Sequence, residues 1–237
     1  MPKRGKKYRD SIQKVDRMRT YAPVEAVDLV KEMAQSKFDE TVELHMNLNV
    51  DPRHADQQVR STVSLPAGTG KSLRIMVFAE GEAATAAEAA GADYVGTDEF
   101  VKKIQDGWLE FDVAVAIPQA MGKIGRLGRV LGPRGMMPSP KAGTVVQPDD
   151  VGDTISELRK GRVEFRVDRT ANLHIPIGKS SFTAEQLQQN FAAVMEAVLR
   201  ARPSSVKGQY IKSLTITSTM TPGVRMDIAA AREFKMA

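Results

Sequence analysis

The residues with the clearest chemical character lie in one stretch, residues 121–146. Glycine permits left-handed backbone and close approach, and proline fixes φ, so this stretch is predicted to be an ordered loop, not a helix or strand. It holds no acidic residue, and it carries five cations that could contact a polyanion: Lys123, Arg126, Arg129, Arg134 and Lys141. The alternative is a structural connector that happens to be basic, and the stretch alone does not decide between the two.

A second stretch resembles a phosphate-binding loop. Gly70, Lys71 and Ser72 match the end of that motif, but the first glycine of the motif falls on Leu65. The segment after Ser72 is predicted to be a strand, whereas a phosphate-binding loop leads into a helix whose N-terminal amides hold the anion. The sequence therefore argues against nucleotide hydrolysis.

Composition excludes several kinds of site. The chain has no cysteine, which rules out disulfides and thiol chemistry. Three scattered histidines without clustered carboxylates argue against a metal site, and no catalytic residue or cofactor is predicted. The N-terminus has no apolar segment after its basic residues, and no apolar run approaches membrane-spanning length. We therefore expect a cytoplasmic protein without a membrane partner.

Positive charge is unevenly distributed along the chain. Residues 68–159 carry 10 Lys/Arg and 13 Asp/Glu, a net of −3, while the remaining residues carry a net of +8. Residues 3–19 alone hold eight basic groups. If the fold separates these two sets, the part made from the chain ends is the better binder of a polyanion. A mildly basic, solvated surface is the alternative.

The middle of the chain has the pattern of an α/β domain. Short apolar strands at residues 73–79, 94–95 and 111–117 alternate with helices at 82–90, 97–106 and 148–160, which predicts a small parallel sheet. Thr97 is expected to cap the second helix. No G-x-G-x-x-G motif follows the first strand, so a dinucleotide site is not supported.

The two ends of the chain have an α+β pattern. Val42 to Val50 alternate with Thr41, Glu43, His45, Asn47 and Asn49, which predicts a strand with one buried face and one polar face. The polar face could be ordinary solvent-exposed surface or a recognition surface. A helix is expected from Pro23, a hairpin from residues 163–167 and 173–177, a helix at 184–200 with a Thr183–Gln186 capping box, and a strand at 210–217.

The simplest architecture combines both patterns in two domains. We expect a split α+β domain of the βαβ type, built from residues 1–67 and 160–237, and an inserted α/β domain at residues 68–159. The two strands that connect them could act as a hinge.

Several motifs, in this order along the chain, identify a family resemblance. They are KFDETVELHMNLNVDPRHADQQVRSTVSLPAGTGK (37–71), GADYVG (91–96), LGRVLGPRGMMPSPKAGTV (127–145), GRVEFRVDRTANLHIPIGKSSF (161–182) and STMTPGVR (218–225). Together they span nearly the whole chain after the basic arm. They resemble ribosomal protein L-one, the stalk protein of the large ribosomal subunit, in its bacterial form.

The resemblance implies a fold and a function. It implies a split domain that binds ribosomal RNA and a Rossmann-like inserted domain hinged to it. It also implies a protein that is a monomer within the ribosome, on the stalk near the exit site, where it assists release of deacylated tRNA. The expected further partner is the leader of its own messenger, whose translation it would repress.

By matching motifs, the resemblance also implies RNA-binding residues. They are Lys37, Phe38, Thr41, Glu43, His174, Lys179, Ser218, Thr219 and Met220. One departure is Thr221, because the family usually has glycine there, and a side chain could hinder close approach of RNA. The basic stretch at residues 121–146 then belongs to the acidic insert. It would contact a passing tRNA or rRNA backbone, or be a structural loop facing the other domain.

Two other functions remain as alternatives. An enzyme could act on a phosphorylated substrate with Lys71 or the basic stretch, which would require nucleotide or phosphate binding. A general nucleic-acid chaperone would bind unrelated RNA with comparable affinity.

Overall fold

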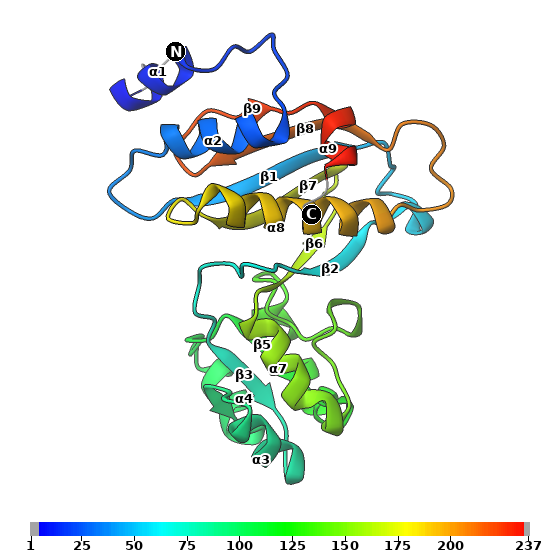
Figure 1. Ribbon diagram of the computed structural model, residues 1–237. Coiled ribbons are helices and arrows are strands. Elements are labelled where there is room, and N and C mark those ends of the chain that lie inside the picture. Colours follow the sequence, from blue (N-terminus) through cyan, green and yellow to red (C-terminus); the bar gives the residue numbers. More distant parts are fainter. Residues whose placement is uncertain (1–4, 235–237) are drawn as a thin grey trace. The chain divides into compact units, whose positions relative to one another are not determined.

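The computed structural model describes residues 5–234 of the chain, which divide into two compact units (Figure 1). The first unit contains the chain up to Gly70 and from Gly161 onward, and the second contains Lys71–Lys160. Each unit has its own apolar core. Residues 1–4 of the basic arm, including Lys3 and Arg4, lie outside the described residues.

The first unit contains a four-stranded antiparallel sheet with the strand order β7-β1-β8-β9. Its elements are α1 (Lys6–Gln13), α2 (Pro23–Met33), β1 (Thr41–Leu48), η1 (Ala55–Gln57), β2 (Arg60–Ser64), β6 (Arg162–Arg166), β7 (Asn172–Lys179), α8 (Ala184–Arg200), β8 (Ile211–Ser218), β9 (Val224–Arg225) and α9 (Ile228–Glu233). β2 and β6 form a separate two-stranded antiparallel ribbon.

Helices α2 and α8 cover one face of the four-stranded sheet (Figure 1). The strict alternation predicted for β1 is confirmed, because Val42, Leu44, Met46 and Leu48 are buried while the residues between them are partly exposed. Helix α8 begins with the predicted capping box, in which Thr183 and Gln186 exchange hydrogen bonds. Its apolar stripe packs against the sheet, and full burial of each large side chain stabilises the fold by about 1.5–3 kcal/mol.

A buried asparagine fixes the segment that follows β2. The Asn190 side chain donates to the carbonyls of Gly68 (2.9 Å) and Ile177 (2.7 Å) and accepts from the Ala67 amide (2.9 Å). The side chain is fully buried, and its hydrogen bonds offset the cost of removing it from water. Gly68 and Gly70 therefore allow the chain to pass close to α8 and its neighbours, and they do not form a phosphate-binding loop.

The second unit contains the predicted parallel sheet, with the strand order β4-β3-β5. Its elements are β3 (Ile75–Phe78), α3 (Glu82–Ala89), β4 (Tyr94–Val95), α4 (Asp98–Gln105), β5 (Val113–Ala116), η2 (Pro118–Ala120), α5 (Met121–Ile124), η3 (Gly125–Leu127), α6 (Gly128–Leu131), η4 (Pro140–Ala142), η5 (Pro148–Asp150) and α7 (Val151–Arg159). The chain is therefore a mixture of α/β and α+β structure, as predicted.

The prediction of a non-helical loop is wrong for residues 121–131, which form the consecutive helical turns α5, η3 and α6. Ile124, Leu127 and Leu131 recur at helical spacing and are fully buried. Their burial outweighs the low helix propensity of the glycines between them. Left-handed glycines occur only later in the stretch, at Gly135 and Gly143.

Two smaller predictions are also corrected. β6 and β7 do not form a hairpin, because β6 pairs with β2 whereas β7 pairs with β1. The two strands thus belong to two different sheets that share one apolar core, and a turn with Ala171 at a positive φ redirects the chain between them. Thr97 precedes α4 without capping it, since its hydroxyl hydrogen-bonds to the Ala79 carbonyl instead (3.4 Å).

Candidate nucleic-acid interface

The polar face of the four-stranded sheet lies on the side away from α2 and α8 (Figure 1). Strand register arranges its side chains in rows across the sheet. Glu43 lies between Pro176 and Thr217, His45 between His174 and Thr215, and Asn47 between Asn172 and Ser213. Arg225 extends the histidine row, because it is the partner of Thr215 on β9. We call this surface the open face.

At one end of the open face, three candidate residues come together. The Lys179 ammonium donates to the Thr41 hydroxyl (2.8 Å), and the Thr219 hydroxyl accepts from the Thr41 amide (3.0 Å). Residues 37–41, 179–181 and 218–221, which are far apart in the sequence, therefore meet at this end.

A buried carboxylate, Glu40, joins these segments. Only 1% of the residue is exposed. Its carboxylate accepts hydrogen bonds from the Ser36 amide (3.1 Å), the Ser218 hydroxyl (2.6 Å) and the Met220 amide (3.0 Å). Burial acts to raise the pKa of Glu40, but these hydrogen bonds outweigh it and hold the pKa below its usual value. The carboxylate is therefore ionised at neutral pH and ties the turn at 218–221 to the segment before β1.

Two large apolar side chains project from the joined segments. Phe38 is 54% exposed and Met220 is 59% exposed, unlike most large apolar residues of the chain. An aromatic ring can stack on a base, and a thioether adapts to ribose or base surfaces. Lys37 is exposed beside Phe38 in the sequence, and among the described residues it has no ion-pair partner.

The turn after β8 has both buried and exposed side chains. Ser218 is buried, so its hydroxyl holds Glu40 and does not lie on the surface. Thr221 also turns inward, where its hydroxyl accepts from the Ser218 amide (2.9 Å). The side chain that replaces the family's usual glycine thus does not project from the turn.

A row of titratable side chains crosses the open face. The Nδ1 atoms of His45 and His174 are 2.7 Å apart, so a single proton is shared between the two rings. Glu43 lies 3.8 Å from the far nitrogen of His45, and Asp168 lies 3.7 Å from that of His174. Burial and the neighbouring His174 lower the pKa of His45, and Glu43 opposes them. His45 therefore resists protonation.

The five cations of the basic stretch lie in the second unit, which has its own apolar core. Arg126 and Arg129 are exposed on the helical turns whose opposite side is buried. Arg134 and Lys141 are exposed farther along. Lys123 differs, because it pairs with Glu80 (2.8 Å) and Asp98 (2.9 Å), which neutralise its charge.

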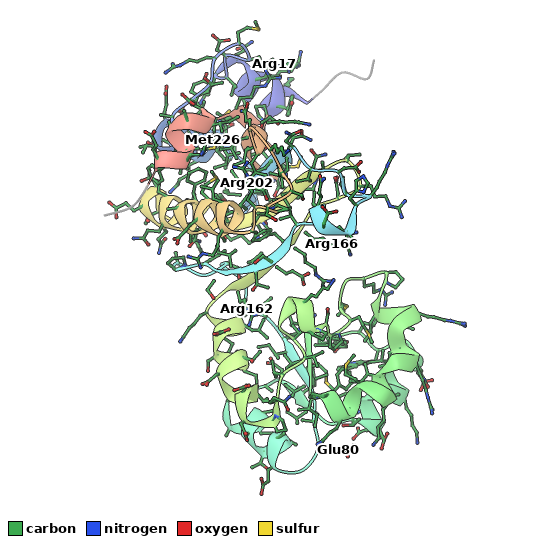
Figure 2. The ribbon with its side chains drawn as sticks, turned by 90° about the vertical axis from the view of Figure 1, so that its right-hand side faces the viewer. Arg17, Glu80, Arg162, Arg166, Arg202 and Met226 are labelled. Atoms are coloured by element: carbon green, nitrogen blue, oxygen red, sulfur yellow. The ribbon has the colours of Figure 1, made fainter. Side chains whose placement is uncertain are left out.

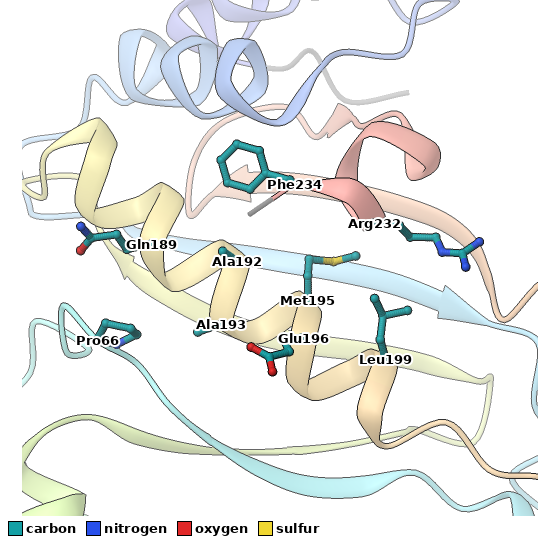
Figure 3. A pocket seen from close by; sticks show the side chains of 9 residues that line it. All are labelled: Pro66, Gln189, Ala192, Ala193, Met195, Glu196, Leu199, Arg232 and Phe234. Carbon is teal, nitrogen blue, oxygen red and sulfur yellow. The ribbon is translucent and has the colours of Figure 1, made fainter. Parts of the chain in front are cut away.

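The described residues do not offer the features of a metal site or of a membrane-spanning segment. No group of three or more His, Asp or Glu side chains could hold a metal ion there, and no helix is long and apolar enough to cross a membrane. A cavity of about 540 Å³ beside α8 and α9 is lined largely by apolar and small side chains, including Ala192, Met195 and Phe234 (Figure 3). It holds one carboxylate, Glu196, and one guanidinium, Arg232, and no histidine or hydroxyl nucleophile.

Comparison with known proteins identifies a family. The model of the Ribosomal protein L1p/L10e family matches residues 30–222. The chain belongs to this family. Among relatives in the L1p/L10e family, the large ribosomal subunit protein uL1 of Chloroflexus aggregans is 57% identical over 237 residues, with 100% of both chains covered. The uL1 protein of Thermomicrobium roseum is 55% identical over 234 residues, covering 98% of this chain and 97% of that protein.

Membership in the L1p/L10e family confirms the sequence-based resemblance and argues against the enzyme alternative, since the matched relatives are named as ribosomal proteins. Sequence reasoning missed two features of the candidate site. Glu40 was detectable, because it falls in phase with the buried residues of β1, where a charged side chain requires partners. The contact between His45 and His174 had no local signal, since it depends on strand register.

Proposed function

We propose that this protein is a constituent of the large ribosomal subunit that binds ribosomal RNA through the open face and the adjoining turn. One observation carries the proposal. The buried Glu40 network holds Phe38 and Met220 outward beside rows of hydrogen-bonding side chains. A surface of this kind has no use in packing, and it suits the base faces and ribose edges of a folded RNA.

Each candidate residue has a distinct role in this proposal. Lys37 and Lys179 supply positive charge to phosphates, which provides affinity without sequence information. Glu43 accepts hydrogen bonds from ribose 2′-hydroxyls or base amino groups, and His174 and Thr219 add further polar contacts. Phe38 and Met220 contact base or ribose surfaces. Ser218 acts indirectly, by holding Glu40.

The family resemblance supports two finer parts of the proposal. The protein assists release of deacylated tRNA at the exit site, with Arg126, Arg129, Arg134 and Lys141 of the second unit facing an RNA backbone. It also represses its own messenger by binding an rRNA-like leader. Neither part needs a cofactor, and both need only RNA contacts and a monomer within the ribosome.

The site is tested by two substitutions in the turn. Thr219→Ala removes the hydroxyl that accepts from Thr41, and Met220→Asp places a negative charge where RNA approaches. Each should weaken binding to large-subunit rRNA by about 1–3 kcal/mol in filter binding, because an interface hydrogen bond or apolar contact is lost. Thr85→Ala and Thr85→Asp, at an exposed position of α3, are the matched controls. Wild-type affinity of both turn variants would overturn the assignment.

A further inference from the structure

Two arginines lie directly opposite each other in the β2–β6 ribbon. The register pairs Arg60 with Arg166, so both side chains leave the same face of the ribbon. Arg166 is labelled in Figure 2. Like charges at directly opposed positions destabilise a strand pair. Glu164 relieves only one of them, because it forms an ion pair with Arg60. Within the described residues, Arg166 has no ion-pair partner.

The turn after β6 adds a third arginine. Arg60, Arg166 and Arg169 all line a small cavity of about 220 Å³, together with Gln58 and the Val59 and Val167 segments. Arg169 is exposed and, among the described residues, also lacks an ion-pair partner. Arg60 is partly neutralised by Glu164, but Arg166 and Arg169 remain able to bind an oxyanion, because a guanidinium can donate two parallel hydrogen bonds to it.

The carboxylate that lines the same cavity is already engaged. Asp168 accepts hydrogen bonds from the Thr170 amide (2.8 Å) and the Asn172 amide (2.8 Å), and from the Thr170 hydroxyl. The hydrogen bond from the Asn172 amide, with those from Thr170, lowers the pKa of Asp168 despite partial burial. Asp168 therefore stabilises its own turn and forms no ion pair with Arg166 or Arg169, and the described lining has three arginines against this one carboxylate.

The cavity adjoins the open face. Asp168 lies 3.7 Å from His174, a candidate RNA contact, so the cavity and the histidine row share this residue. We propose that the cavity bounded by Arg60, Arg166 and Arg169 binds a backbone phosphodiester of the same RNA whose bases meet the open face. This inference rests on the proposed function and adds to it a phosphate site on the β2–β6 ribbon.

The test compares arginine variants of the full-length chain in rRNA filter binding over a range of salt concentrations. Arg166→Ala and Arg169→Ala should each weaken binding about tenfold, as expected for a lost charge-assisted contact. Each should also make the slope of log affinity against log salt shallower by about 0.7–0.9, because one phosphate contact disappears. Arg166→Lys keeps the charge but loses the bidentate geometry, and should give an intermediate affinity with a nearly unchanged slope.

The matched control is Arg200→Ala. Arg200 lies exposed on α8, is paired with Glu196, and its removal changes the net charge by the same amount. It should leave the affinity and the slope within about twofold of wild type, since it removes no phosphate contact. Thermal unfolding of each variant shows whether it is folded. If an alanine variant does not fold, the reduced affinity expected for Arg166→Lys still tests the proposal.

Three outcomes separate the possibilities. Equal affinity and slope for Arg166→Ala, Arg169→Ala and Arg200→Ala would overturn the phosphate site and leave the proposed function standing. Saturable binding of inorganic phosphate that is lost in Arg166→Ala, with unchanged RNA affinity, would also overturn it and assign the cavity to a small anion. If the wild-type protein does not bind rRNA, the proposed function fails together with this inference.

Discussion

At the scale of single residues, the candidate site depends on a buried charge at a position where the alternating pattern predicts an apolar residue. Glu40 directly precedes β1, in phase with its buried apolar residues, and it accepts three hydrogen bonds there. A buried carboxylate is tolerated only when it is this well satisfied. Its function is to fix backbone segments, so that Phe38 and Met220 stay outward.

Glu40→Gln should test this positioning role. An amide keeps the shape but has one acceptor oxygen instead of two, so at least one buried donor loses its partner. We expect the free energy of unfolding to fall by about 1–3 kcal/mol in urea denaturation, and rRNA affinity to fall with it. Glu43→Gln, on the polar face of the adjoining strand β1, should change stability by less than about 0.5 kcal/mol.

The pH dependence of Glu40→Gln gives an independent check. Because the folded state lowers the pKa of Glu40, its stabilising effect is present above the ordinary carboxyl pKa and is lost as pH falls through the folded-state value. Wild type and Glu40→Gln should therefore converge in stability in acid. A stability difference that stays constant down to low pH would contradict the assigned role of the carboxylate.

The histidine pair should make stability sensitive to pH near neutrality. Burial and His174 lower the pKa of His45 below the ordinary value of 6.5, so the unfolded chain binds more protons there than the folded one. The groups around the pair are Glu43 and Asp168, with Thr215 and Arg225 on the adjacent strands. The contribution of His45 is thus present above its unfolded-state pKa and is lost as pH falls.

The expected measurement is urea unfolding of wild type and His45→Gln between pH 8 and pH 5. The stability advantage of wild type should shrink as pH is lowered through this window. His54→Gln is the control, since His54 is largely exposed. An advantage that grows in acid would show that the pair is stabilised by protonation, contrary to this expectation.

At the scale of secondary structure elements, local patterns predicted most of the fold. The alternation in β1, the capping box of α8 and the proline at the start of α2 each determine one element by contacts between near neighbours in the chain. These are the features that propensity and periodicity describe.

The failed predictions share a different cause. The β6–β7 hairpin was inferred from adjacency, yet each strand found its partner more than 90 residues away in the chain, at β2 or β1. In residues 121–131, glycine content suggested a loop, but burial of Ile124, Leu127 and Leu131 decided the helical turns. Tertiary packing and strand register also create the Glu40 network and the histidine pair, which no local window contains.

At the scale of the whole molecule, the chain leaves the first unit and returns to it at one place. The Leu65 amide donates to the Gly161 carbonyl (3.2 Å), and a Cβ added to Gly161 would lie only 2.7 Å from the Cα of Gly68. The points where the chain leaves the first unit and returns to it are therefore neighbours. The core of the first unit contains residues from both of its chain segments and none from Lys71–Lys160.

Residues 1–70 joined to 161–237 by two or three glycines should therefore fold without the insert and bind rRNA. The join keeps Gly68 in place, which Asn190 holds, and a linker of this length spans the short gap. If the open face carries the binding, affinity in filter binding should stay within about threefold of the full chain, with an unchanged salt slope. A shallower slope would indicate that Arg126, Arg129 or their neighbours contact the same RNA. A fragment that folds by circular dichroism and yet does not bind would contradict the assignment of RNA binding to the first unit.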